Sequence, residues 1–131
     1  MLSRSLRNDE SGSAPVEFVL VGALLTLLTL GVLQLGIGVY VRNVVHDAAV
    51  EGAYHAALAD ETLADGAQRT RELITRAVGA SYATQVEASM SSLGGQQIVQ
   101  VSVRAPMPVL GLLGAPGAWE VTADAPAEDL E

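Results

Sequence analysis

The sequence predicts an α+β, membrane-anchored fold: a long N-terminal transmembrane helix that continues into a small domain with a second helix and a three-stranded antiparallel sheet. Three observations predict it. An apolar run without any charged residue extends from Phe18 to Val41. A segment of helical period follows over 62–78, and the hydrophobic residues after it alternate with a period of two.

The apolar run is long enough to cross a bilayer. At about 1.5 Å per residue, its roughly 24 residues extend about 36 Å as a helix, which exceeds the roughly 30 Å thickness of the hydrocarbon layer. It is about twice as long as the apolar core of a cleaved signal peptide. The expected organisation is therefore a cytoplasmic leader over 1–12, a transmembrane and extended helix over 13–59, and a small exported α+β domain over 60–131.

Charge gives the expected orientation and excludes one class of partner. Arg4 and Arg7 precede the span, whereas Arg42 alone follows it closely, and this bias favours a cytoplasmic amino terminus in a single-pass protein of the cytoplasmic membrane. The chain carries 15 acidic and 7 basic residues, a net charge of -8, which argues against nucleic acid as a partner. There are no cysteines, and hence neither disulfides nor thiolate metal sites.

Glu17 is an acidic residue at the amino-terminal edge of the apolar run, where a charge is costly and usually has a partner. Its position alone leaves two interpretations open. The carboxylate is either solvated at the lipid headgroups near the positive end of the helix dipole, or it has an assembly role.

The surrounding residues favour the second interpretation. Gly12, followed five residues later by Glu17 and then by an apolar helix, resembles the processing motif of type IV prepilins. The wider sequence 12–19, with 40–43 and the alanine-rich 48–53 beyond the span, resembles the TadE-like minor pilin family of tight-adherence pili.

The resemblance implies a processing site and an assembly site. A prepilin peptidase would cut between Gly12 and Ser13, and Glu17, which precedes Phe18, would pair with the new amino group and set the register of packed helices. It also implies other pilin subunits, the pilus assembly machinery and the lipid bilayer as partners, and possible display in a surface pilus after processing. Pro15 departs from the small residue usual at its position.

A stripe of small and hydroxyl residues runs along the span at spacings of four, three, seven and four. Such a stripe lets a second helix approach closely in lipid, although glycine is common in these helices anyway. Two roles therefore remain open for the stripe: a seam that packs against a second helix, or a surface that only faces lipid. The residues are Gly22, Thr26, Thr29, Gly36 and Tyr40.

The helix is expected to continue past the span to about Leu58, with one buried face of small residues. A second helix is expected over 62–78, begun by a capping box of Thr62 and Asp65 and ended near Gly79. We expect outward ion pairs four residues apart. The expected buried faces are Val41, Val45, Ala48, Gly52, Ala56 and Ala59 in the first helix and Leu63, Ala67, Thr70, Ile74 and Ala77 in the second, and the expected pairs are Asp65–Arg69, Glu72–Arg76 and Glu51–His55.

Alternating residues then predict a β-hairpin with a turn at 93–96 and a third strand around 119–124. The apolar, Pro- and Gly-rich segment 105–117 is either a loop that adds to the core or an exposed contact patch. The acidic tail from Pro126 is expected to be frayed. The expected inward-facing residues are Val86, Ala88, Met90, Val99, Val101, Val103, Trp119, Val121 and Ala123.

No catalytic motif occurs: there is no Gly-x-Ser-x-Gly, no phosphate-binding glycine loop and no His-Glu-x-x-His. The sequence therefore predicts neither an enzyme, nor a cofactor or metal, nor a small-molecule substrate. Two functions remain: a structural subunit of a pilus, processed after Gly12, or an uncleaved single-pass accessory protein of a secretion or pilus-assembly complex.

Overall fold

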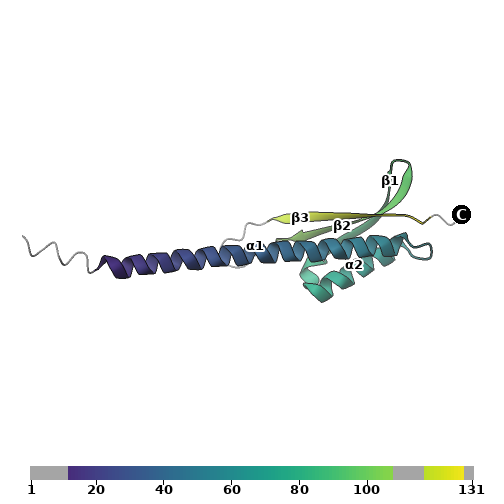
Figure 1. Ribbon diagram of the computed structural model, residues 1–131. Coiled ribbons are helices and arrows are strands. Elements are labelled where there is room, and N and C mark those ends of the chain that lie inside the picture. Colours follow the sequence, from purple (N-terminus) through teal and green to yellow (C-terminus); the bar gives the residue numbers. More distant parts are fainter. Residues whose placement is uncertain (1–11, 108–116, 129–131) are drawn as a thin grey trace, which may run out of the picture. The chain divides into compact units, whose positions relative to one another are not determined.

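The computed structural model describes residues 12–107 and 117–128. It confirms the predicted fold class, a long apolar helix, a second helix and a three-stranded antiparallel sheet (Figure 1). The elements are the helices α1 (Ser13–Ala57) and α2 (Leu63–Ala77), the short 3-10 helix η1 (Ala80–Tyr82), and the strands β1 (Gln85–Leu93), β2 (Gln96–Pro106) and β3 (Ala118–Pro126).

The chain divides into two compact units, Met1–Gly36 and Ile37–Glu131. The described part of the first unit is the beginning of α1, whose large apolar side chains are exposed. Among the described residues, α1 is the one helix long and apolar enough to cross a membrane, and none of its most apolar window is buried. An exposed, uninterrupted apolar surface of this kind needs lipid or another apolar partner to cover it.

In the second unit, α1 buries two adjacent rows of small residues instead of the single row expected. Val41, Val45 and Ala48 are buried as predicted, but Ala49 and Ala53 are buried as well. The second row exists because α1 packs against both α2 and the sheet, and small side chains let the backbone approach each of them. The expected burial of Ala59 is wrong, since this residue lies beyond the end of α1 and is exposed.

Helix α2 begins with the predicted capping box. The backbone amide of Asp65 donates to the Thr62 hydroxyl, and the backbone amide of Thr62 donates to the Asp65 carboxylate at 2.9 Å. At the other end Gly79 has φ +111°, a conformation that favours glycine and ends the helix. The buried positions include Gly66, which was not expected, whereas Ala77 is exposed.

The capping box makes the stability of the domain pH-dependent. Hydrogen bonds from the Thr62 side chain and backbone hold the pKa of Asp65 below its ordinary value of 3.8. Because the folded-state pKa is depressed, the stabilisation is complete above the unfolded-state pKa of about 3.9 and is lost as pH falls through the folded-state value. We expect the difference in melting temperature between wild type and Asp65→Ala to be full at about pH 6 and to shrink as the pH is lowered below about 3.9. A Thr62→Ala background should weaken this pH dependence, and a difference that stays constant with pH would contradict the assignment.

The sheet has the order β1-β2-β3, with both pairs antiparallel. β1 and β2 are joined by the two residues Gly94 and Gly95 with φ +61° and +84°, the positive values that a type I′ hairpin turn requires. The inward positions of β2 and β3 are fully buried valines and alanines, as the alternation predicts. Met90 on β1 was expected on the same face but is 48% exposed.

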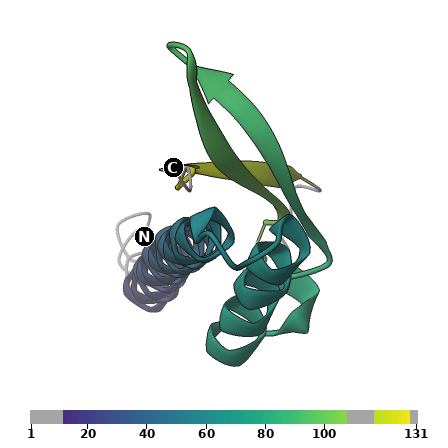
Figure 2. The ribbon, with the colours of Figure 1, turned by 90° about the vertical axis from the view of Figure 1, so that its right-hand side faces the viewer.

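Figure 2 shows why Met90 is exposed. Both helices of the second unit lie on one side of the sheet, and the β1–β2 hairpin extends away from them towards its tip. The core therefore lies between the helices and the sheet, including the beginning of β1 at Val86, and the hairpin end has no helix beneath it.

The tail is ordered further than expected. The backbone amide of Ala127 donates to the Gln97 carbonyl, and that of Glu128 donates to the Ala57 carbonyl, each at 3.1 Å. The second of these bonds ties the end of β3 to the end of α1. Most of segment 105–117, for which two interpretations were open, lies outside the described residues, as do residues 1–11 of the expected leader.

The expected pairs of charged residues along each helix are wrong. Arg69 donates to the Glu51 carboxylate from both Nε and a terminal nitrogen, at 3.1 and 2.6 Å, in place of Asp65. His55 lies 3.5 Å from Glu61 instead of pairing with Glu51. Glu72 accepts from Gln68 at 3.2 Å, and Arg76 has no ion-pair partner among the described residues. The contact between Arg69 and Glu51 thus joins the two helices, whereas the one between Gln68 and Glu72 stays within α2.

Candidate functional site

The predicted processing position lies where the helix begins. Gly12 occupies an exposed turn and Ser13 is the first residue of α1. A side-chain carbon added at Gly12 would meet no atom within 4 Å, so nothing in the described structure obstructs access to the peptide bond between these residues. Pro15 falls in the first helical turn, where the missing amide hydrogen is not needed by the helix.

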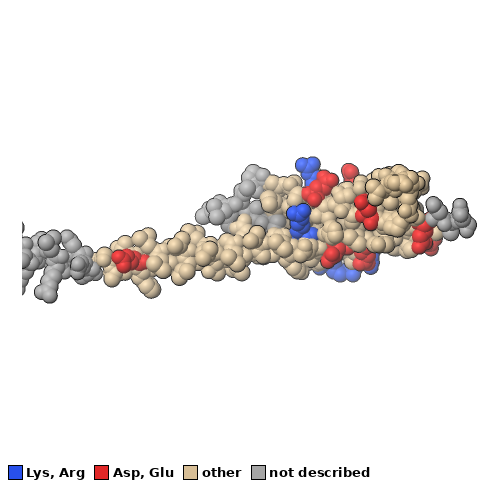
Figure 3. All heavy atoms as spheres, turned by 45° about the horizontal axis from the view of Figure 1, so that its top comes forward, with Lys and Arg blue, Asp and Glu red and all other residues tan. Residues whose placement is uncertain are grey.

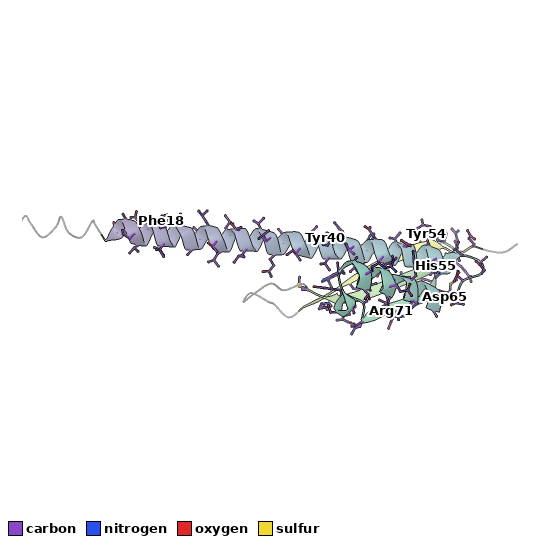
Figure 4. The ribbon with its side chains drawn as sticks, turned by 90° about the horizontal axis from the view of Figure 1, so that it is seen from below. Phe18, Tyr40, Tyr54, His55, Asp65 and Arg71 are labelled. Atoms are coloured by element: carbon purple, nitrogen blue, oxygen red, sulfur yellow. The ribbon has the colours of Figure 1, made fainter. Side chains whose placement is uncertain are left out.

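Glu17 follows one turn after Ser13, and residues four apart share a face of a helix. Glu17 is exposed, and Phe18 beside it is 79% exposed (labelled in Figure 4). Figure 3 shows this part of the helix uniformly tan apart from one acidic side chain. The pair therefore presents one carboxylate and one large ring at the beginning of an otherwise apolar surface.

The predicted packing stripe lies on one side of α1, since its spacings keep all five residues within about 40° of one line at 100° per residue. The two threonine hydroxyls in it are satisfied within the helix. Thr26 Oγ1 donates to the Gly22 carbonyl and Thr29 Oγ1 donates to the Leu25 carbonyl, each at 2.8 Å. Thr26 and Thr29 can thus enter an apolar environment without an unpaired hydroxyl.

The glycines of the stripe have open space around them. A side-chain carbon at Gly22 or Gly36 would meet nothing within 4 Å, and Tyr40 at the end of the stripe is 59% exposed. Gly31, also open, lies on the opposite side of the helix at 100° per residue and provides a matched control. Open space of this kind suits both a packing seam and contact with lipid.

A second surface feature lies in the connection between α1 and α2. A shallow groove there is lined by Tyr54 and His55 at the end of α1, by Leu58 after it, and by acidic and polar residues of α2, among them Asp65 (Figure 4). Among residues 12–107 and 117–128, no group of three or more His, Asp or Glu side chains is arranged to hold a metal ion. The groove is charged and open, and its described residues match none of the site residues that the sequence predicted.

Comparison with known proteins identifies the same amino-terminal segment as the sequence analysis. No curated protein and no solved structure matches the chain significantly. A protein family does match, and the match begins at Gly12 and includes Glu17, the apolar part of α1 and the first alanines of the domain core. Residues 12–53 match the TadE-like protein family, which confirms over this segment the resemblance that the sequence indicated.

Proposed function

We propose that this chain is a structural subunit, a TadE-like minor pilin of a tight-adherence, type IV-like pilus, with a structural rather than an enzymatic role. The observation that carries the proposal is the coincidence of three boundaries at one place. The family match starts at Gly12, α1 starts at Ser13, and the apolar surface starts beyond Glu17. A leader, a cut and an assembly helix would meet at this point.

In this proposal a prepilin peptidase hydrolyses the peptide bond between Gly12 and Ser13. Ser13 then carries a free amine one helical turn from the Glu17 carboxylate, in its own or in a neighbouring subunit. An ion pair formed in an apolar environment is far stronger than one in water, and it would fix the register of adjacent helices. The leader stays in the cytoplasm, and the domain from residue 60 onward is exported.

The amino-terminal residue of the mature protein tests the processing step. In cells with a prepilin peptidase we expect the purified protein to begin at Ser13, and in cells without it to begin at Met1 or Leu2. Gly12→Ala should abolish the cut, because the side chain enters a position that the peptidase subsite keeps free. Gly31→Ala, another open glycine of α1, should be cut normally. An uncut wild-type protein in sheared surface filaments would overturn the proposal.

Pro15 favours a second candidate function. A proline as the third residue after the cut rigidifies the chain that a peptidase must bind, and so it favours an uncleaved, single-pass accessory protein of a secretion or pilus-assembly complex. In that case Gly12→Ala would be silent and all of the protein would remain in the membrane fraction. Glu17→Val separates the two candidates further, since a processed pilin should be cut normally but fail to enter filaments.

A further inference from the structure

The exported domain begins without a linker after the apolar run. Val41, the last residue of that run, is 5% exposed and belongs to the hydrophobic core of the second unit, together with Val45. The preceding residue, Tyr40, is 59% exposed. If α1 spans the bilayer, as the proposed function requires, no stalk separates the lipid from the domain. The end of the domain that holds Val41 must then lie at the lipid surface.

The hydrogen bond between Glu128 and the Ala57 carbonyl identifies the strands at this end. From Glu128 back to Trp119, β3 covers about 30 Å at about 3.3 Å per residue. The same distance along a helix takes about 20 residues at 1.5 Å each, which leads from Ala57 back to about residues 37–42. Figures 1 and 4 agree, with the connected ends of β2 and β3 beside the part of α1 that enters the domain.

Three arginines reach the same end. Gly66 contacts Gly52 where the two helices meet, and α2 runs back along α1 at an angle (Figures 1 and 2). Arg76, ten residues after Gly66, therefore lies towards the same end of the domain as Arg42, ten residues before Gly52. Arg104 precedes Ala105, which pairs with Trp119, so Arg104 lies at the same end of the sheet as Trp119 but on its outer face.

All three arginines are exposed, and none forms an ion pair within the described residues, although Glu120 faces Arg104 in the strand register. Figure 3 shows basic side chains near this end of the unit, with acidic side chains beside them, and acidic side chains alone at the other end.

Apolar groups accompany the arginines. Met107 is 51% exposed, and Trp119 packs partly against the core and is partly exposed. A tryptophan with one side on protein and one side free suits the boundary between headgroups and hydrocarbon. We propose that Arg42, Arg76, Arg104, Met107 and Trp119, here called the basal end, bind a phospholipid surface, with the arginines on phosphates and Trp119 and Met107 in the interface.

Trp119 is the only tryptophan in the chain, so its fluorescence reports on the basal end directly. We would measure the full chain in lipid nanodiscs, using brominated phospholipid as the quencher in the lipid and iodide as the quencher in water. We expect brominated lipid to quench Trp119 strongly and iodide to quench it weakly. The matched control moves the tryptophan to the hairpin by Leu93→Trp with Trp119→Phe. Leu93 is 69% exposed, and there iodide should quench strongly and brominated lipid should not.

Phosphatidylglycerol in the nanodisc should increase the quenching of Trp119 by brominated lipid, and the triple variant Arg42→Gln, Arg76→Gln, Arg104→Gln should lose that increase. The proposal is overturned if iodide reaches Trp119 as readily as it reaches the hairpin, or if both quenchers fail because another protein chain covers it. If the chain co-elutes with nanodiscs, either of these results contradicts only the lipid contact of the basal end and not the membrane anchor. A chain that does not enter nanodiscs contradicts the anchor itself, and with it the proposed function.

Discussion

Gly66→Ala is expected to unfold the exported domain or to separate α2 from α1. A side-chain carbon at Gly66 would lie 2.4 Å from Ala56 Cβ and 2.6 Å from the Gly52 carbonyl oxygen. The oxygen belongs to the backbone of a continuous helix, and Ala56 has no flexible side chain that could turn aside. Only a shift of one helix against the other removes the clash.

The expected cost is about 3 kcal/mol, at the upper end of the range for overpacked cores, even though alanine favours a helix by about 1 kcal/mol over glycine. The measurement is denaturant unfolding of the full chain in detergent, followed by Trp119 fluorescence. Ala64→Gly, the reverse change at an exposed position of α2, should cost only about 1 kcal/mol. If Gly66→Ala were stabilising, the close contact of the two helices would be wrong.

The neighbouring position offers an independent check on this contact. A side-chain carbon at Gly52 would lie 1.8 Å from Thr70 Oγ1 and 2.8 Å from the Gly66 carbonyl oxygen. Thr70→Ala removes the first obstacle and leaves the second, so it should rescue part of the stability lost in Gly52→Ala. It should rescue none of the loss in Gly66→Ala, whose obstacles are Ala56 and a backbone oxygen.

The elements of this fold could be predicted because each has a local cause. Uncharged residues specify the apolar helix, Thr62 and Asp65 begin α2, and Gly94 with Gly95 provides the hairpin turn. All of these signals lie within a few neighbouring residues. These signals do not depend on residues far away in the sequence, and so the fold class could be predicted from the sequence.

The contacts between elements could not be predicted in the same way. Arg69 has Asp65 four residues before it, yet it binds Glu51, which the helix crossing brings near. From the sequence alone, Gly66 would be expected only to lower the stability of its helix. Its role in the close contact is evident only once Gly52 is known to lie against it. The second buried row, with Ala49 and Ala53, appears only once α1 is known to have two neighbours. For the candidate site, Gly12 and Glu17 were found by motif, whereas the basal end joins residues from four elements and needs the register of β3.

Ile74→Ala is the second substitution with a large expected effect, because Ile74 is the largest fully buried side chain of the domain. The core around it consists mainly of valines and alanines, among them Val45 and Ala48 of α1 and Val101 of β2. Alanine side chains on a rigid helix cannot turn into a vacated space, so the cavity left by the substitution would collapse little.

We expect Ile74→Ala to cost about 3–4 kcal/mol and Ile74→Val about 1 kcal/mol, measured by the same unfolding experiment. A small domain has a total stability of roughly 5–10 kcal/mol, so the alanine variant should also become sensitive to proteases at temperatures that the wild type withstands. Thr75→Ala, at an exposed position next in the chain, should change stability by less than about 0.5 kcal/mol. Equal costs for the alanine and valine variants would mean that the core around Ile74 is loosely packed, and that α2 is not held to α1 and the sheet through this residue.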